Sequence, residues 1–140
     1  MNGEKYKVPT MKQIEKVKGT NGYNVVSTFS GCGGSCLGYE MAGYNVLYAN
    51  EFIPEAQRTY RANHKNVCLD TRDIRVIQPE EILEMTKLKK GELDLFDGSP
   101  PCSSFSILGK REKGWGKVKT YSDTKQRTDD LFFEYIRILK

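Results

Sequence analysis

The chain has 140 residues, of which 38% are hydrophobic and 29% charged, a balance typical of an ordinary soluble globular domain. No apolar run approaches the roughly 18 residues needed to span a bilayer, and the polar, lysine-bearing N-terminus lacks the apolar segment of a secretory signal. The formal net charge of +4 permits nucleic-acid binding without requiring it. We therefore expect a cytoplasmic protein with no membrane association.

Cysteine usage points to a reducing compartment and away from metal binding. The four cysteines, Cys32, Cys36, Cys68 and Cys102, show no spacing typical of a disulfide framework. Cys32 and Cys36 form a single C-x3-C pair, and His64 is the one histidine of the chain, so a second pair of zinc ligands is lacking. We expect no metal site.

Residues 1–22 are basic and weakly patterned. Ile14 and Val17 suggest at most one turn of helix, and the glycines that follow favour a turn or a linker. From Asn24 the apolar pattern becomes regular. We therefore divide the chain into a basic N-terminal extension, 1–22, and a domain over residues 23–140.

Strands and helices alternate after residue 23. Strands are expected at 24–29, 45–50, 67–69 and 93–96, and helices between 34 and 43 and at 54–64, 79–90 and 128–139. The apolar residues expected to face the core are Leu37 and Met41 in the first helix, Ile82, Met85 and Leu88 in the third, and Leu131, Tyr135 and Ile138 in the last. Apolar strands joined by helices predict an α/β fold, with a parallel sheet of about four strands and right-handed crossovers.

Polar or glycine-rich segments follow each predicted strand. They are 30–34 after the first strand, Glu51 after the second, Asp73 after the third and 99–102 after the fourth. In open parallel sheets, ligands bind at the carboxyl ends of the strands, so these segments should meet at one edge. We predict the ligand site there.

The first of these segments contains Gly31, Gly33 and Gly34 ahead of a helix, where the backbone can approach a ligand closely. Cys36 stands where a dinucleotide fingerprint would have its third glycine, and no lysine follows the glycines as it would in a P-loop. Glu51, twenty residues after Gly31, could accept hydrogen bonds from both hydroxyls of a ribose. Together these features favour an adenosine-containing cofactor over the alternative of a structural turn and a surface acid, and they do not separate NAD from S-adenosylmethionine.

Three further residues at this edge each have two interpretations. Asp73 could accept a hydrogen bond from an adenine amino group or cap a turn, and Asp70 competes with it for the same role. Phe29 could stack on a base or fill the core. The residue types fit either role.

Cys102 lies just beyond a rigid exit from the fourth strand. Pro100 and Pro101 cannot donate to a sheet ladder, and Ser99 before them is restricted to extended geometry. A thiol held in this way could act as a nucleophile, although a free cysteine is more often a small buried hydrophobe. The basic residues that follow suggest a polyanionic substrate, or else a solvated loop. They are Lys110, Arg111, Lys113, Lys117 and Lys119.

Several of these segments together resemble the ordered motifs of the DNA cytosine-5 methyltransferase family. The matching segments are FSGCGG at 29–34, NEF at 50–52, DI at 73–74, SPPCSSFS at 99–106 and the stretch 128–139. Their order and spacing agree from about residue 24 to residue 140. The resemblance implies the Rossmann-like parallel sheet of S-adenosylmethionine-dependent methyltransferases, in truncated form.

The resemblance implies a role for each matching residue. Phe29 would pack on the adenine of S-adenosyl-L-methionine, residues 31–34 would line its methionine part, and Glu51 would hold its ribose. Phe52 would lie beside the adenine ring, and Asp73 would bind its amino group. The full implied cofactor set, in which Leu131 closes the pocket, is Phe29, Ser30, Gly31, Cys32, Gly33, Gly34, Glu51, Phe52, Asp73, Ile74, Ser99 and Leu131.

For catalysis, the resemblance implies that Cys102 adds to C6 of cytosine, with Pro101 orienting it, so that C5 can take the methyl group. The stretch 103–127 would close over double-stranded DNA from which the target base is flipped. Its implied DNA contacts are Ser103, Ser104, Ser106, Lys110, Arg111 and Lys113. A cognate restriction endonuclease is a candidate partner, and a bacterial protein of this kind would be associated with the nucleoid.

Two departures from the family pattern bear on activity. Ser27 stands where the family usually has an acidic residue, and the Glu-Asn-Val motif that protonates N3 of cytosine occurs nowhere in the chain. We therefore expect an incomplete part of a longer enzyme that is inactive by itself. The alternatives are a tRNA cytosine-5 methyltransferase of the same family, a non-catalytic remnant that binds S-adenosylmethionine or DNA, and a nicotinamide-dependent oxidoreductase.

Overall fold

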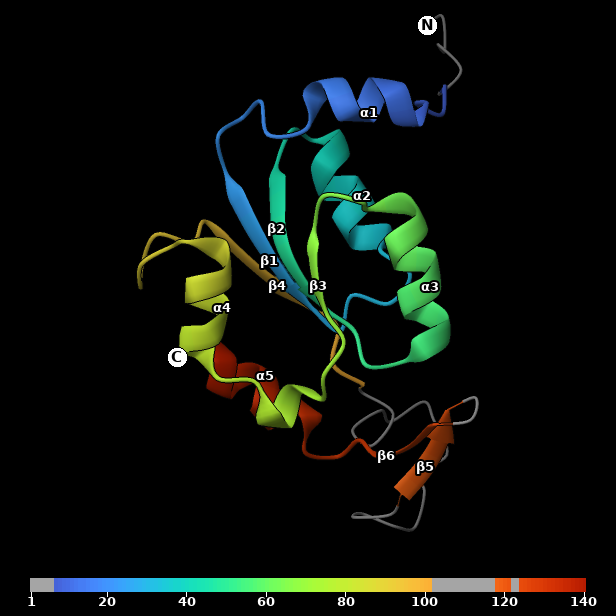
Figure 1. Ribbon diagram of the computed structural model, residues 1–140, viewed down its shortest axis with the longest axis vertical. Helices are drawn as coiled ribbons and strands as arrows, with labels where there is room; N and C mark the ends of the chain where they lie inside the picture. Colours follow the sequence, from blue (N-terminus) through green and yellow to red (C-terminus); the bar gives the residue numbers. More distant parts are fainter. Residues whose placement is uncertain (1–6, 102–117, 122–123) are drawn as a thin grey trace, which may run out of the picture.

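The computed structural model describes residues 7–101, 118–121 and 124–140, and it shows a parallel sheet with helices on both faces (Figure 1). In the described residues this sheet has the strand order β3-β2-β1-β4. Its strands are β1 (Asn24–Thr28), β2 (Asn45–Asn50), β3 (Cys68–Asp70) and β4 (Leu95–Gly98). Every neighbouring pair is parallel, so the predicted α/β fold is confirmed. Because β1 lies between β2 and β4, the segments that follow these three strands begin side by side.

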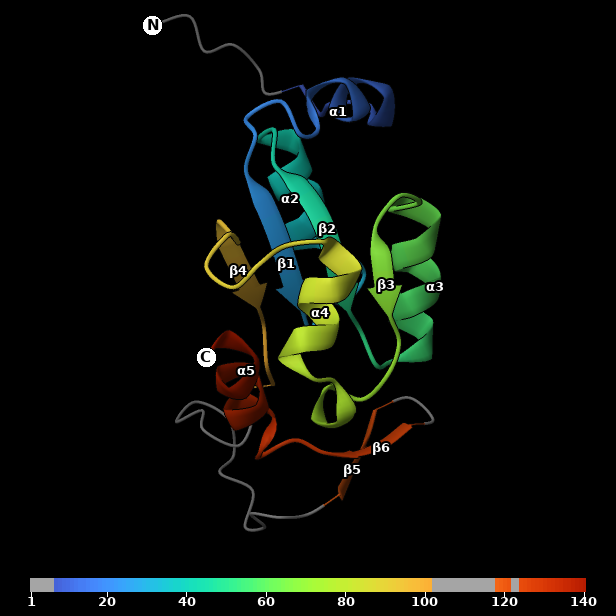
Figure 2. The same ribbon diagram turned by 60° about the vertical axis from the view of Figure 1, so that its left-hand side comes forward.

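The helices form two layers around the sheet. Helices α2 (Gly34–Met41) and α3 (Pro54–Asn63) lie on one face, and α4 (Pro79–Thr86), α5 (Leu131–Leu139) and the 3-10 helix η1 (Ile74–Val76) lie on the other (Figure 2). Successive side chains of β1 point to opposite faces and so separate two cores. Val25 packs with Cys36 and Tyr60 on the α2–α3 side, whereas Val26 packs with Ile82 on the α4–α5 side. None of the helices in the described part of the chain has the length and apolarity to cross a membrane.

An extra residue in β2 keeps its side chains aligned with those of β1. Val25 pairs with Val46, but Val26 pairs with Tyr48, so Leu47 has no partner in the register. This β-bulge lets Tyr48 join Val26 in the α4–α5 core, where its hydroxyl donates a hydrogen bond to the carboxylate at the end of β3 at 3.0 Å. Without the extra residue, the tyrosine would point to the opposite face.

The inner face of α2 differs from the prediction. The sequence predicts that Leu37 and Met41 face the core, whereas the buried residues are Cys36 and Glu40, and Met41 is 37% exposed. Hydrophobic periodicity misses this face because one of its members is charged. Glu40 is buried, and its half-buried ion-pair partner Lys18 places its Nζ 2.7 Å from Glu40 Oε1.

Helix α4 is shorter than predicted. It ends at Thr86 instead of continuing to residue 90, because Lys87 adopts a left-handed conformation with a φ of 60°. Ile82 is buried as expected, but Met85 is 46% exposed, and Leu88 lies beyond the helix. The predicted inner stripe was therefore right for Ile82 and wrong for Met85.

The last strand and the last helix each begin later than predicted. Strand β4 begins at Leu95, two residues late, because it pairs with the last four residues of β1. Helix α5 begins at Leu131, with Asp130 rather than Thr128 as its N-cap. Thr128 is buried ahead of the helix. Two of the expected core residues of this helix, Leu131 and Ile138, are buried.

A two-stranded antiparallel sheet occupies part of the stretch that the sequence predicts as a loop. Its strands are β5 (Val118–Tyr121) and β6 (Thr124–Arg127). By contrast, β2 and α3 agree with the prediction to within one residue.

The N-terminal residues form more structure than one turn. Helix α1 (Met11–Val17) covers seven residues, and its Ile14 is 3% exposed. Lys18 follows the helix directly and makes the ion pair with Glu40 described above. Helix α1 is therefore packed against α2.

Removing the buried side chain of α1 tests whether this helix stabilises the domain. Replacing Ile14 with alanine should lower the free energy of unfolding by about 2 kcal/mol, because it leaves a cavity under the helix. Val17→Ala is the matched control, since Val17 is 39% exposed and its loss should cost less than about 0.5 kcal/mol. Urea unfolding followed by circular dichroism measures both. Equal midpoints for the two variants would contradict the packing of α1.

Candidate active site

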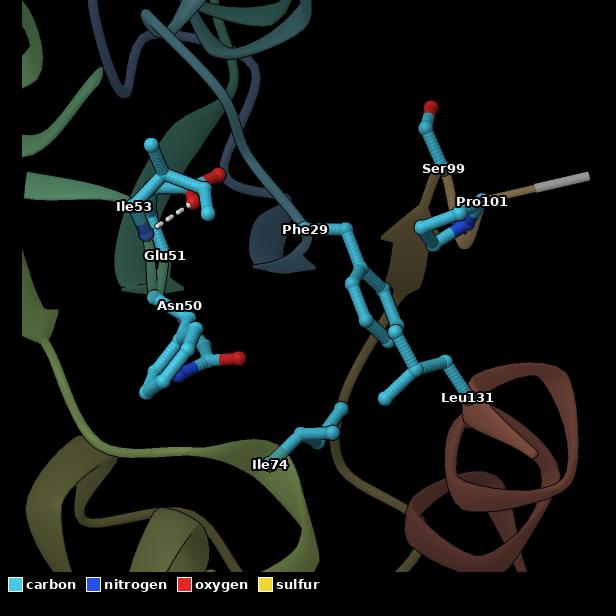
Figure 3. A pocket seen from close by; sticks show the side chains of 9 residues that line it. Phe29, Asn50, Glu51, Ile53, Ile74, Ser99, Pro101 and Leu131 are labelled. Carbon is cyan, nitrogen blue, oxygen red and sulfur yellow. Dashed lines mark hydrogen bonds between the residues drawn. The ribbon is translucent and has the colours of Figure 1, made fainter. Parts of the chain in front are cut away.

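A pocket with a cavity volume of about 150 Å³ lies at the edge of the sheet where β1, β2 and β4 end, and it is partly open to solvent (Figure 3). It is lined by Phe29, Asn50, Glu51, Phe52, Ile53, Ile74, Ser99, Pro101 and Leu131. The lining comes from five parts of the fold: the ends of β1, β2 and β4, and the starts of η1 and α5 on the neighbouring layer. In Figure 3 the ring of Phe29 lies next to Leu131, with Glu51 and Ile53 on the far side of the opening. The predicted meeting of strand ends at one edge is therefore present.

The carboxylate of Glu51 joins two of the segments that form the pocket. Glu51 is 7% exposed. Its Oε2 accepts a hydrogen bond from the Gly31 N–H at 2.8 Å, and its Oε1 accepts one from the Ile53 N–H at 2.7 Å. Each carboxylate oxygen can accept more than one hydrogen bond, so the group can still receive ligand hydroxyls from the pocket side.

The glycine-rich segment after β1 has an unusual backbone. Gly31 and Gly33 have φ angles of 56° and 89°, which glycine adopts without cost. Phe29 also has a positive φ, 53°, which is uncommon for a residue with a side chain and costs energy. This conformation turns the Phe29 ring into the pocket. The remaining members of the implied cofactor set in this segment, residues 30–34, do not line this pocket.

A buried polar network supports the glycine-rich segment from behind. His64 Nε2 lies 3.1 Å from the Gly33 carbonyl oxygen, and Nδ1 lies 3.2 Å from Glu40 Oε2. Both ring nitrogens thus face oxygen acceptors, and only the doubly protonated ring can donate to both. Burial alone would raise the pKa of Glu40, but hydrogen bonds from His64 and Lys18 outweigh it and hold this pKa below its ordinary value. The sequence signals of this network are limited to a lone histidine, His64, and a glutamate, Glu40, within the predicted helix.

The two aspartates considered for the adenine amino group are bonded elsewhere. Asp73 caps η1: its Oδ1 accepts from the Arg75 N–H at 3.0 Å and its Oδ2 from Arg75 Nη1 at 2.8 Å. Asp70 Oδ2 accepts a hydrogen bond from the Tyr48 hydroxyl and lies 2.7 Å from Arg72 Nη2. Neither aspartate lines the pocket. A contact between Asp73 and adenine stays a prediction, and the alternative role of Asp73 as a turn cap is present.

The predicted nucleophile follows the pocket-lining segment directly in the sequence. Pro101 lines the pocket together with Ser99 and Phe29, and it is the last described residue before Cys102. Cys102 and the predicted DNA-contacting residues lie outside the described residues, namely Ser103, Ser104, Ser106, Lys110, Arg111 and Lys113.

Two lining residues had no predicted role of their own. Asn50 precedes Glu51 and Ile53 follows it by two residues. Their position at the end of β2 could have identified them as lining residues from the sequence. Asn50 Nδ2 donates to the carbonyl of Arg72 at 2.9 Å and so ties the end of β2 to the turn after β3. Within the described part of the chain, no three potential metal ligands gather at this edge or elsewhere.

Residues 23–140 match the family model of the C-5 cytosine-specific DNA methylases. The chain belongs to this family. The match covers the whole sheet and every residue that lines the pocket, and it confirms the family resemblance read from the motifs. S-adenosyl-L-methionine is the methyl donor of C-5 cytosine methylases, so a site for it is expected at this edge.

Curated relatives of the chain are type II methyltransferases. M.NgoPII of Neisseria gonorrhoeae is 38% identical over 120 residues, which are 86% of this chain and 30% of the relative. M.DdeI of Desulfomicrobium norvegicum is 34% identical over 117 residues, which are 84% of this chain and 25% of the relative. The chain therefore spans about a third or less of the length of these relatives.

Solved structures share the fold of this C-5 cytosine methylase chain. A protein described as a DNA modification methyltransferase encoded within a prophage of E. coli matches with a TM-score of 0.53 at 33% identity, over 60% of this chain and 24% of the other. DNMT2 of Spodoptera frugiperda matches with a TM-score of 0.57 at 24% identity, over 84% of this chain and 31% of the other. The second likeness concerns the fold alone.

A pair of glycine substitutions tests the support of the glycine-rich segment by His64. Both Gly31 and Gly33 have positive φ angles, so alanine should cost about 1 kcal/mol at either position from backbone conformation. A Cβ at Gly33 would also overlap the His64 ring, whereas a Cβ at Gly31 meets nothing within 4 Å. Gly33→Ala should therefore lower the free energy of unfolding by about 3 kcal/mol in total, measured by denaturant titration. If both alanine variants lost the same stability, the close approach of His64 to the segment would be wrong.

Proposed function

We propose that residues 23–140 form the cofactor-binding, nucleophile-bearing N-terminal part of a DNA cytosine-5 methyltransferase. The complete enzyme would transfer a methyl group from S-adenosyl-L-methionine to C5 of cytosine in double-stranded DNA. The observation that carries this proposal is that Pro101, the residue before Cys102, lines the same pocket as Phe29 and Glu51. Membership of the C-5 cytosine methylase family supports it.

The pocket residues fit the adenosyl group of the methyl donor. Phe29, Ile74 and Leu131 supply an apolar wall of the kind that an adenine ring packs against. Glu51 supplies a buried carboxylate for the ribose hydroxyls, and the next residue, Phe52, also lines the pocket. The glycine-rich segment would line the methionine part, since its backbone lacks side chains that would block a close approach.

The chemistry proposed for Cys102 follows from the weak nucleophilicity of cytosine C5. The Cys102 thiolate would form a bond to C6, and the electron pair of the C5–C6 double bond would then be available at C5. Bound S-adenosyl-L-methionine supplies the electrophilic methyl group that C5 accepts. Loss of the C5 proton to a base and departure of the thiolate from C6 restore the aromatic ring. Pro101 would orient the cysteine by fixing the backbone just before it.

DNA would be the partner of the segment that follows Cys102. Serines and basic side chains there would contact the phosphates of a duplex from which the target cytosine is flipped. We propose Ser103, Ser104, Ser106, Lys110, Arg111 and Lys113 for these contacts. A cognate restriction endonuclease would share the target sequence, because the relatives are type II methyltransferases, and the cytoplasm is the compartment that such a pair requires.

Calorimetric titration tests the cofactor assignment. S-adenosyl-L-methionine should bind, and Glu51→Gln should weaken its binding about tenfold, because a charged acceptor for two ribose hydroxyls is lost. Glu55→Gln is the matched control, because Glu55 lies in the first turn of α3 and pairs with Arg58 at the surface. This variant should bind S-adenosyl-L-methionine as tightly as the unmodified protein. Binding of NAD without binding of S-adenosyl-L-methionine would end the methyltransferase proposal.

Trapping on a fluorinated base tests the nucleophile. With 5-fluorocytosine in DNA, the C5 fluorine cannot leave as a proton would, so the complete enzyme should stay covalently joined to the DNA. Cys102→Ser should abolish the adduct, whereas Cys68→Ser should leave it intact, since Cys68 is exposed at the start of β3. Denaturing electrophoresis measures the adduct. An adduct that persists in the Cys102 variant would assign the nucleophile to another residue, and an adduct with tRNA instead of DNA would change the substrate class.

The 140-residue chain by itself should bind the cofactor without turnover, because it contains no Glu-Asn-Val segment.

A further inference from the structure

Asp97 is a carboxylate near the end of β4 whose neighbours are hydroxyl groups. It lies directly opposite Ser27 of β1, whose hydroxyl donates to its Oδ2 at 3.1 Å, and it is also hydrogen-bonded to the Tyr39 phenol. By contrast, Asp70 and Asp73 at this edge pair with arginines. Within the described residues, Asp97 forms no ion pair, and its side chain is only half-buried.

A short relay of hydroxyl groups connects Asp97 to the glycine-rich segment. Ser30, the first residue of that segment, places its Oγ 3.0 Å from Ser27 Oγ and 3.1 Å from the Ser27 carbonyl oxygen. Ser27 in turn bonds the carboxylate. The acid is thus held two hydrogen bonds away from the start of the segment that the methionine part of the methyl donor would follow.

The charge of Asp97 also reaches the first turns of α2, which follow the glycine-rich segment. Burial raises the pKa of the Tyr39 phenol, and the negative charge of Asp97 raises it further. Burial likewise raises the pKa of Cys36, with Asp97 contributing in the same direction. Both residues belong to α2, and Ser27, which bonds the carboxylate, is also hydrogen-bonded to Cys36 on this face of the sheet. The charge of Asp97 also raises the pKa of Tyr135 in α5, after the larger effect of burial.

A positively charged group of a ligand would give the Asp97 carboxylate the cationic partner that it lacks among the described residues. S-adenosyl-L-methionine carries two positive groups, the sulfonium and the α-ammonium. The sulfonium methyl must face the base beside Cys102, which leaves the ammonium, with three N–H donors, for the methionine end of the site. We infer that Asp97 accepts a hydrogen bond from the α-ammonium of the bound methyl donor, while Ser27 and Ser30 hold the carboxylate in place. This inference rests on the proposed function.

Two ligands that differ only in the amino-acid part test this role. S-adenosylhomocysteine carries the ammonium, whereas 5′-methylthioadenosine has the same nucleoside and a thioether but no amino acid. Asp97→Asn removes the charge and keeps the shape, so it should weaken S-adenosylhomocysteine binding about tenfold, the worth of one charge-assisted hydrogen bond. Binding of 5′-methylthioadenosine should not change. Isothermal titration of the purified protein measures all four affinities.

Asp94→Asn is the matched control, because Asp94 precedes β4 and accepts from the Asn24 N–H at 2.8 Å at the opposite end of the strands. Both ligands should bind this variant as they bind the unmodified protein. Moving the carboxylate one strand across, by Ser27→Asp together with Asp97→Ser, should restore S-adenosylhomocysteine binding. Unchanged S-adenosylhomocysteine affinity in Asp97→Asn, or an equal loss for both ligands, would overturn the inference. If the unmodified protein bound neither ligand, the proposed function would fail as well.

Discussion

The bridge made by the Glu51 carboxylate is the interaction on which the rest of the site depends. By accepting from the backbone of Gly31 and of Ile53, it locks the segment after β1 to the segment after β2. A parallel sheet brings these segments to one edge, but it does not fix their separation. A buried carboxylate between them does, because Glu51 Oε2 would lose its Gly31 donor if the two segments moved apart. The pocket therefore has a defined width before any ligand enters it.

Other polar groups hold the two remaining sides of the site. His64 and Glu40 support the Gly33 carbonyl from the α2–α3 layer, and the ion pair with Lys18 extends this support to α1. On the opposite layer, Arg75 joins Asp73 to Asp130, so that the start of α5 is fixed against η1. Leu131 follows Asp130 directly and lines the pocket next to Phe29 (Figure 3). The site is thus assembled from strand ends and is held from behind by buried or half-buried charges.

The sequence predicted those features that depend on apolar pattern and on strand ends. The alternation of strands and helices gave the sheet, and the positions of Phe29, Glu51 and Ser99 after successive strands placed them at one edge. What it missed depends on charges that are buried in pairs. A glutamate in a helix usually faces solvent, so the sequence predicts that Leu37 and Met41 of α2 face the core instead of Glu40.

The helix ends and the small sheet were missed for a different reason, which is that they depend on backbone conformation and on pairing between distant segments. The left-handed conformation of Lys87 could not be predicted from its residue type, because lysine is a good helix former. The pairing of β5 with β6 lacks a turn signal of the Asn-Gly type. The role of Asp97 was hidden in the same way. The family usually carries its acid at the position of Ser27, and only the register between β1 and β4 shows that Asp97 lies directly across from it.

A crystal structure of the protein with bound S-adenosylhomocysteine tests most directly whether the thiol and the adenosyl pocket share one edge. The distance to measure joins the ligand sulfur to Cys102 Sγ. We expect about 10 Å or less, the span of two near-attack contacts of about 3.5 Å joined through the C5–C6 bond of cytosine and a sulfur–methyl bond. Ligand density in the pocket of Phe29 and Glu51 with the thiol at that distance would agree with the proposed chemistry. A thiol on the opposite end of the sheet, or a ligand bound elsewhere, would contradict it.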